Sequence, residues 1–249
     1  AGAVGGLVRR VPTRGAQLDR APPRAGVARR GGVGGALLAL MGAPAFAEMP
    51  ESAPVLSLPS AAAAGDVAAV RRALDAGAPI ESRDARGRTP LLLATHGGYV
   101  AAAQLLMARG ADVNAQDDQR DSAFLLAGAR GHTEIVRAAL AHGADWRITN
   151  RFGGTALIPA CERGHVETVR VLLATDIDVD HVNNLGWTAL LEAVILGSRG
   201  AAHQAIVGLL LPRGAAVNLA DREGVTPLQH AERQGQRAVA ALLRAAGGR

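Results

Sequence analysis

The chain has 249 residues, a formal net charge of +5 and one cysteine, Cys161. A single cysteine excludes an intramolecular disulfide framework and a cysteine-based metal site. The charge is unevenly divided: residues 1–47 carry seven Arg against Asp19, a net charge of +6, whereas residues 48–249 carry 20 Arg and 21 acidic residues, a net charge of −1. Because nucleic-acid binding needs a basic surface on the folded part, we expect no nucleic-acid partner.

The first 47 residues are typical of a targeting signal. An arginine-rich segment ends at Arg29-Arg30, a short apolar stretch follows over 31–41, and Ala45-Phe46-Ala47 forms a small-x-small cleavage site. The apolar stretch is too short to remain as a membrane anchor. We therefore expect cleavage between Ala47 and Glu48, a linker over 48–59, and a mature protein in the periplasm or secreted. The export route, general secretory or twin-arginine, stays open, as does the alternative that 1–47 is a GC-biased extension of a cytoplasmic protein.

A repeat of 33 residues runs through the rest of the chain. Ser or Thr recurs every 33 residues from Thr89 to Thr188, and Thr226 follows after 38, so this repeat carries about five extra residues around 198–202. A fixed period of this size predicts a stack of small units, none of which can bury its apolar face alone. The units in register are 84–116, 117–149, 150–182, 183–220 and 221–249, and a degenerate unit precedes them over 61–83.

Each unit opens with a polar turn that ends in Gly, as at Gly87, and continues with Thr followed by Pro or Ala. Thr suits the N-cap of a helix and Pro suits its first position, which predicts a short helix over 91–95 and its equivalents. A longer second helix follows, and a Gly ends it. The residues that support this pattern are Thr89, Thr155, Thr188 and Thr226 at the caps, Ile135, Val136, Ala139, Leu140, Val169, Val171, Leu172 and Leu173 at helical spacing, and Gly110, Gly143 and Gly214 at the ends.

Two positions depart from this pattern. Pro159 lies inside a first helix, where it lacks a backbone donor and should kink or shorten that helix. Asp176-Ile177 replaces the Gly-Ala that follows the other second helices, so the pattern gives less support for the hairpin-like loop there. Cys161 falls at a small, helix-packed position, and we expect it to be buried. A reactive thiol or an intermolecular disulfide is the alternative.

The chain resembles the ankyrin repeat family over residues 55–249. The matching segments are GRTPL at 87–91, GADVNA at 110–115, GHTEIV at 131–136 and GHVE at 164–167. The resemblance implies an all-α ankyrin-repeat solenoid over 60–249, built of helix-turn-helix units joined by β-hairpin-like loops. It also implies a monomer without cofactor, metal or catalysis, which binds an unidentified protein on its concave face. The residues expected on that face are Arg86, Arg88, His96, Gln119, Asp121, Arg130, Arg151, Phe152, Glu162, Arg163, Leu185, Trp187, Ile195 and Leu196.

Aromatic residues near the loop tips suggest where a partner binds. Trp146, Phe152 and Trp187 fall in the loop segments of consecutive repeats. Large apolar residues are unusual at such tips, and Trp and Arg dominate binding hot spots. We expect Phe152, Leu185 and Trp187 to form an apolar patch rimmed by arginine. The alternative is that Trp146 and Trp187 pack between the loops and rigidify them.

The polar residues give little sign of chemistry. No His-x-x-x-His or His-Glu-x-x-His pattern occurs, and we expect His132, His165 and His203 to bond backbone groups at the turn between helices. Glu192 and His230 occupy equivalent positions in the first helices of adjacent repeats, so we expect their side chains to meet. That contact is either a satisfied polar pair within the stack or a general acid–base pair.

Three functions follow from these observations. The first is a protein–protein interaction module in the periplasm. The second is an accessory or protective factor for a periplasmic enzyme, for example in stress defence. The third is an enzyme that uses Glu192 and His230. The sequence identifies the scaffold and leaves the partner open, because one scaffold can carry many binding surfaces.

Overall fold

The computed structural model describes residues 56–197 and 200–249. The expected leader, its cleavage site and most of the expected linker lie outside the described residues. The first helix begins at Leu58, inside the range 48–59 that the sequence assigns to the linker. The helices are α1 (Leu58–Ala64), α2 (Val67–Asp75), α3 (Pro90–His96), α4 (Val100–Ala108), α5 (Ala123–Arg130), α6 (Thr133–Ala141), α7 (Leu157–Glu162), α8 (Val166–Leu172), α9 (Ala189–Ile195), α10 (Ala201–Leu210), the 3₁₀ helix η1 (Leu211–Arg213), α11 (Pro227–Arg233) and α12 (Arg237–Ala245).

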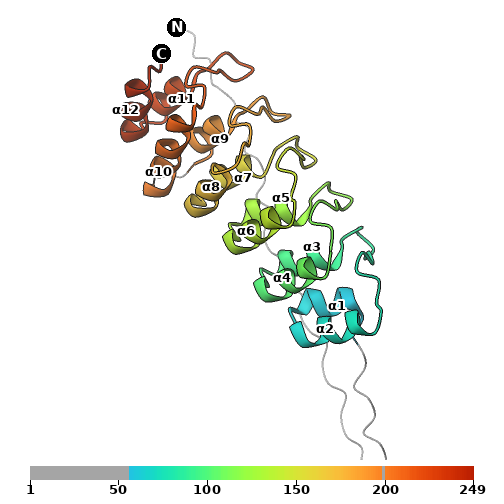
Figure 1. Cartoon of the computed structure of the whole chain (residues 1–249). Helices are drawn as coiled ribbons and strands as arrows, with labels where there is room; N and C mark the ends of the chain where they lie inside the picture. The colour runs from blue at the N-terminus through green and yellow to red at the C-terminus, as the bar shows by residue number, and fades with distance from the viewer. Residues whose placement is uncertain (1–55, 198–199) are drawn as a thin grey trace, which may run out of the picture. The chain divides into compact units, whose positions relative to one another are not determined.

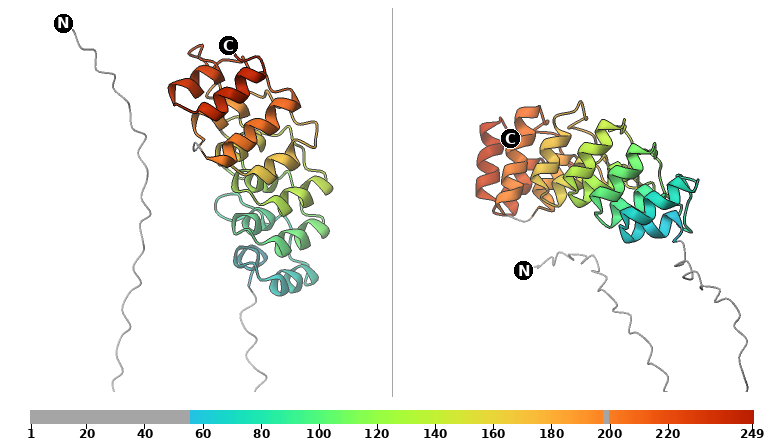
Figure 2. Two further views of the ribbon diagram at one scale, coloured as in Figure 1. Left: turned by 90° about the vertical axis from the view of Figure 1, so that its left-hand side faces the viewer. Right: turned by 60° about the horizontal axis from the view of Figure 1, so that its bottom comes forward.

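The helices form antiparallel pairs that stack in chain order (Figure 1). Each first helix contacts the first helix of the next pair, from α1 through α3, α5, α7 and α9 to α11, and the second helices form a parallel row. Long loops join the pairs along one edge of the stack, and both rows are visible side by side in Figure 2. No strand occurs within 56–197 and 200–249. The expected all-α solenoid is confirmed.

Hydroxyl side chains cap most of the first helices, as the sequence predicts. The exception is Thr155, whose Oγ1 is buried without a hydrogen-bond partner, so the predicted cap there is wrong. Pro159 explains the difference: it has no N–H for the carbonyl of Thr155, and its ring crowds that carbonyl. As expected for an interior proline, α7 is shortened to six residues and starts only at Leu157. The caps that do form are Ser57, Thr89, Ser122, Thr188 and Thr226, each accepting a backbone N–H three residues later.

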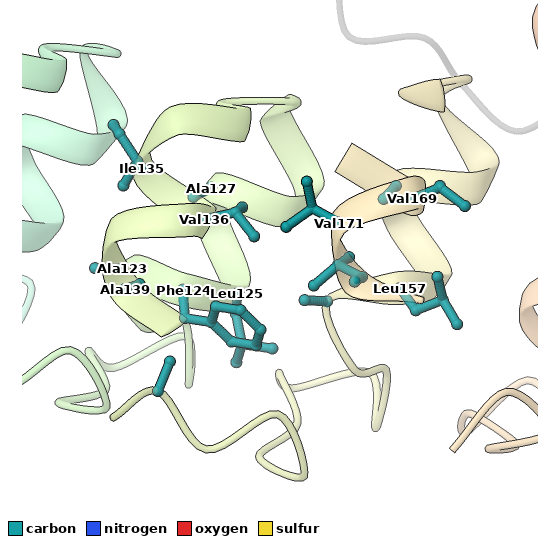
Figure 3. Close-up of a cluster of buried hydrophobic side chains, with 14 of the residues drawn as sticks. Ala123, Phe124, Leu125, Ala127, Ile135, Val136, Ala139, Leu157, Val169 and Val171 are labelled. Atoms are coloured by element: carbon teal, nitrogen blue, oxygen red, sulfur yellow. The ribbon is translucent and has the colours of Figure 1, made fainter. Parts of the chain in front are cut away.

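The second helices bury the predicted apolar face. Figure 3 shows Ile135 and Val136 of α6 with Val169 and Val171 of α8, all in the same hydrophobic core as the ring of Phe124. Leu172 and Cys161 are fully buried in this core, which confirms the core position predicted for the cysteine. Because each pair is too short to bury this face alone, the contacts between repeats hold the stack together.

The end of a second helix depends on its glycine. Gly110 and Gly143 follow α4 and α6 with φ of 90° and 83°, a left-handed conformation that glycine adopts without steric cost. No glycine follows α8, which ends at Leu172 after seven residues instead of nine. The chain turns there through Thr175, whose hydroxyl donates to the carbonyl of Leu172 at 2.7 Å. The departure at Asp176-Ile177 thus changes the end of α8, whereas the loop over 177–188 has the same succession of turns as the loop over 111–122.

A ladder of rings links successive repeats at the turn between their two helices. In each case the ring of one repeat lies over a glycine of the preceding repeat, whose φ is between 69° and 77°. A Cβ built on any of these glycines would lie 3.0 Å or less from the ring, so only glycine leaves room. The pairs are Tyr99 over Gly65, His132 over Gly98, His165 over Gly131 and His203 over Gly164.

Two of the three histidines in this ladder bond the backbone as expected. The backbone of Ala129 hydrogen-bonds His165, and His203 Nε2 lies 2.9 Å from the carbonyl of Glu162, so His203 keeps the role despite the insertion before it. His132 differs from the expectation, because its buried Nε2 has no hydrogen-bond partner. The equivalent carbonyl, that of His96, accepts from Arg130 at 3.2 Å.

Candidate protein-binding groove

A groove of about 800 Å³ runs between the loop tips and the first helices of four consecutive repeats. It takes side chains from α3, α5, α7 and α9 and from the loops that precede them. Twelve of the fourteen residues expected on the concave face line it, and Trp187 and Ile195 do not. The twelve are Arg86, Arg88, His96, Gln119, Asp121, Arg130, Arg151, Phe152, Glu162, Arg163, Leu185 and Leu196.

An Asp or Asn at the start of each repeat holds its tip in place. Asn183 Oδ1, for example, accepts the backbone N–H groups of Leu185 at 2.9 Å and Trp187 at 3.0 Å. Such turns order the tip and present the residue two positions later to solvent. These residues were missed as groove residues, although their 33-residue spacing could have identified them. They are Asp84, Asp117, Asn150, Asn183 and Asp221, and all but the first and last line the groove.

Arginines form the polar wall of the groove. Arg163 Nη1 donates to the carbonyl of Ala129 at 2.8 Å, and Arg130 makes the equivalent bond to His96 one repeat earlier. Each of these two guanidinium groups therefore reaches back to the preceding repeat. Arg88 instead pairs with Asp84 at 2.7 Å.

The pKa values of the ionisable groups reflect these arginines. Burial lowers the pKa of His96, and the charges of Arg130, Arg88 and Arg86 lower it further. Burial alone would raise the pKa of Asp84, but its hydrogen bonds with Arg88 bring that pKa down to about 2. Both shifts show that arginine charges act on the ionisable groups at this end of the groove.

The other end of the groove is apolar. Phe152, Leu185 and Leu196 are 53%, 52% and 48% exposed, which is unusual for residues of this size. The guanidinium carbon of Arg151 lies 4.6 Å from the centre of the Phe152 ring, a cation–π contact that orients both side chains. Consecutive repeats thus supply an exposed apolar surface next to the guanidinium group of Arg151.

The two tryptophans differ in their surroundings. Trp146 is half-buried against the core, with Arg147 at 5.0 Å from its ring, and so it packs beneath its loop. Trp187 is also half-buried but is placed outside the groove lining. The role of Trp187 in binding stays a prediction.

The contact expected between Glu192 and His230 is wrong. Glu192 Oε1 accepts from Asn183 Nδ2 at 2.8 Å, and His230 Nε2 lies 2.6 Å from Asp221 Oδ2. Each helix begins directly after its tip, so a side chain in its first turn folds back beneath the Asn or Asp of its own repeat. The acid–base pair is therefore not assembled.

Glu192 is nevertheless unusual. Its side chain is 4% exposed, and its Oε2 is buried without a hydrogen-bond partner. Burial raises the pKa of Glu192 to about 7, the nearby charge of Glu162 contributes, and the hydrogen bond from Asn183 opposes the rise. A buried carboxylate with one unpartnered oxygen destabilises the fold when it is charged.

The remaining chemistry-bearing groups are inaccessible or scattered. Burial, followed by the charge of Glu192, raises the pKa of the Cys161 thiol, which makes it a poor nucleophile. Among residues 56–197 and 200–249, no three His, Cys, Asp or Glu side chains are grouped to hold a metal ion. Within the same residues, every helix is too short or too polar to cross a lipid bilayer.

Comparisons with known proteins agree with this architecture. Two family models match: one described as ankyrin repeats (many copies) over 58–107 and one described as ankyrin repeats (3 copies) over 124–219. An ankyrin repeat domain from Acinetobacter baumannii AYE is 53% identical with a TM-score of 0.74, and the match covers 77% of this chain and 98% of that one.

Other relatives are more distant or match over a shorter segment. The ankyrin repeat protein EF0377 is 38% identical with a TM-score of 0.73, covering 78% of this chain and 98% of that one. The ankyrin repeat domain of Bcl-3, a member of the IkappaB family, is 29% identical with a TM-score of 0.69, covering 78% and 87%. The Escherichia coli K12 ankyrin repeat protein YahD is 48% identical over 56 residues, 22% of this chain and 28% of that protein. The chain therefore matches little more than a quarter of that curated relative.

Proposed function

The chain belongs to the ankyrin repeat family, whose repeats form protein–protein interaction modules, and we propose that it binds its partner protein in the groove formed by α3, α5, α7 and α9. The observation that carries this proposal is the exposed apolar surface of Phe152, Leu185 and Leu196. These side chains come from consecutive repeats and sit on ordered tips or helices, so a partner meets a surface that needs little rearrangement on binding.

Variants at the tips test this proposal. The purified chain is used as bait in an extract of its source cells, next to a Phe152→Ala/Leu185→Ala double variant. Leu242→Ala is the matched control, because Leu242 is an exposed leucine on α12, outside the groove lining. We expect the partner to be lost by the double variant and kept by the control. A partner retained equally by all three proteins would show that it binds elsewhere.

Trp187 separates binding from packing. If Trp187 belongs to the binding surface, Trp187→Ala should weaken binding by at least about 2 kcal/mol, the effect of a hot-spot residue, while stability changes little. If Trp187 is a spacer between loops, the variant loses stability, and affinity falls only as the protein unfolds. Melting temperature and partner affinity measured on the same sample distinguish the two roles.

We also propose that the chain has no catalytic activity of its own. Glu192 and His230 belong to separate hydrogen-bonded pairs, and the Cys161 thiol is buried. An accessory role for an exported enzyme is a narrower form of the binding proposal. It is supported if the captured partner is an enzyme whose activity or stability rises on adding the purified chain.

Export is a further part of the proposal. The basic excess of residues 1–47 and the Ala45-Phe46-Ala47 motif favour cleavage before Glu48 and a periplasmic or secreted mature protein. N-terminal sequencing of native material tests this directly. A first residue upstream of Arg29 would contradict export, whereas a start at or near Glu48 supports it.

A further inference from the structure

We propose that Arg130, Arg151 and Arg163, here called the arginine cluster, bind acidic side chains of the partner, and that these acidic residues lie next to an apolar residue of the same segment. This inference rests on the proposed function and adds the chemistry of the bound segment. The cluster lies midway along the groove, in repeats 117–149 and 150–182, adjacent to the exposed ring of Phe152.

The guanidinium groups of the cluster are held in place before a partner arrives. Arg130 and Arg163 each donate to a carbonyl of the preceding repeat, at 3.2 and 2.8 Å, and Arg151 is oriented by the ring of Phe152. Arg130 Nη2 also lies 3.0 Å from His96 Nε2. A guanidinium group has five N–H donors, so each of the three keeps donors that these contacts do not use. Pre-oriented arginine is well suited to carboxylates, because its planar group can bond both carboxylate oxygens.

The cluster has no carboxylate partner within the described residues. None of its arginines forms an ion pair at 4.0 Å or less. Burial, followed by the charge of Asp117, raises the pKa of Asp121, and the charges of Arg151, Arg163 and Arg130 oppose that rise. All three arginines therefore act on the carboxylate of Asp121, which lines the groove with them.

Three other acidic residues near the cluster have contacts of their own. Asp117 Oδ1 accepts the backbone N–H groups of Gln119 and Asp121, at 2.8 and 3.0 Å, and so holds its own tip. Glu192 is buried and bonded to Asn183. The carboxylate of Asp118 faces the preceding tip at Gly87. Glu162 also lines the groove, but within the described residues it forms no ion pair with the cluster, so the guanidinium groups remain available to a bound segment.

The same surroundings favour carboxylates over a nucleic-acid backbone. Asp118, Asp121 and Glu162 line the groove with the arginines, so the basic surface is interrupted by negative charge. A nucleic-acid backbone needs a continuous basic surface along its length, whereas single carboxylates can bond individual guanidinium groups. Phe152 and Leu185, beside the cluster, form an apolar surface that suits a protein segment in which an apolar residue follows acidic ones.

The chain itself provides a charge-free replacement for the test. Gln234 occupies in the last repeat the position that Arg130 and Arg163 occupy in theirs, and its Nε2 donates to the equivalent carbonyl, that of Ile195, at 3.2 Å. An Arg130→Gln/Arg163→Gln double variant should therefore keep the bonds between repeats and lose two charges. The control is Arg137→Gln/Arg170→Gln, which removes two charges from exposed arginines of α6 and α8, outside the groove lining.

The probe is a fluorescein-labelled, acetylated hexapeptide of four Glu followed by two Leu, with a Gln version as the uncharged comparison. Binding is measured by fluorescence anisotropy and stability by melting temperature. We expect the groove variant to bind the Glu peptide at least about tenfold more weakly, the effect of losing charged hydrogen bonds, with an unchanged melting temperature. The control variant should bind as the wild type does. Asp121→Asn should bind more tightly, because it removes the carboxylate that repels the peptide at the cluster.

Several results would overturn the inference. These are equal binding of the Glu and Gln peptides, equal loss in the groove and control variants, no tightening in Asp121→Asn, or no binding of the Glu peptide at about 1 mM, the weak end of specific association. Tighter binding of a phosphoserine peptide or of single-stranded DNA would do so as well. If the cluster fails while Phe152→Ala/Leu185→Ala still loses the cellular partner, the proposed function stands without this inference.

Discussion

Replacing Glu192 with Gln should stabilise the protein at neutral and alkaline pH. Gln has nearly the shape of a protonated Glu, and its oxygen can accept the bond from Asn183 that Glu192 Oε1 now accepts at 2.8 Å. The variant therefore removes the buried negative charge and keeps the hydrogen bond. Glu162 also loses a neighbouring charge of its own sign.

The size of the effect follows from the pKa of Glu192. Folding raises this pKa from 4.5 to about 7, so between these values the folded protein holds a proton that the unfolded chain has released. Stability from this group is thus fully present below pH 4.5 and is lost as the pH rises towards 7. Each pKa unit corresponds to about 1.4 kcal/mol, which sets an upper bound of about 3 kcal/mol on the gain in Glu192→Gln at pH 8.

Urea unfolding of both proteins at a series of pH values from 4 to 8 measures this gain. The two free energies of unfolding should coincide at pH 4 and diverge steadily up to about pH 7. Glu167→Gln serves as the control, because it removes a surface charge on α8 and should change stability by less than about 0.5 kcal/mol. Parallel pH profiles of wild type and Glu192→Gln, or a variant less stable at pH 8, would refute the reasoning.

Three further predictions concern stability. Leu172→Ala should cost about 2–5 kcal/mol in urea unfolding, because the leucine is fully buried; a cost below about 0.5 kcal/mol would mean that the register of α8 is wrong. Arg120→Gly should stabilise the folded protein by about 0.5–1 kcal/mol, because Arg120 has a φ of 58° at a tip position that is Gly in the other repeats. Gly153→Ala, at the equivalent position, should destabilise it, and a change of the same sign in both variants would contradict this reasoning. EDTA should leave the melting temperature unchanged, and a clear fall would reveal a structural metal.

The sequence predicts the stack well because its signals repeat. A 33-residue period, a Ser or Thr before the first helix and a glycine after the second recur in most units, so a weak signal in one repeat is supported by the same signal in the others. The groove follows for the same reason: tip residues such as Phe152 and Leu185 share that period, and adjacent repeats must place them side by side. Asn150 and Asn183 share it too, and the same reasoning could have found them.

The errors arise where two local effects compete. Thr155 has the sequence of a cap, but Pro159 four residues later removes the helical bond that would position it. Glu192 and His230 lie at equivalent positions, yet a position on a helix does not say whether a side chain turns towards its own tip or towards the next repeat. The left-handed conformation of Arg120 also has no signal in its residue type.

The ladder of rings has a consequence for how such a protein can evolve. Each ring lies over the equivalent glycine of the preceding repeat, so any repeat with that glycine can take the preceding position. Loss of residues 117–149 would bring His165 over Gly98 and Arg163 to the carbonyl of His96, the same contacts that His132 and Arg130 make now. Duplication or loss of a whole unit in the gene therefore lengthens or shortens the groove by one repeat and keeps the contacts between neighbouring repeats.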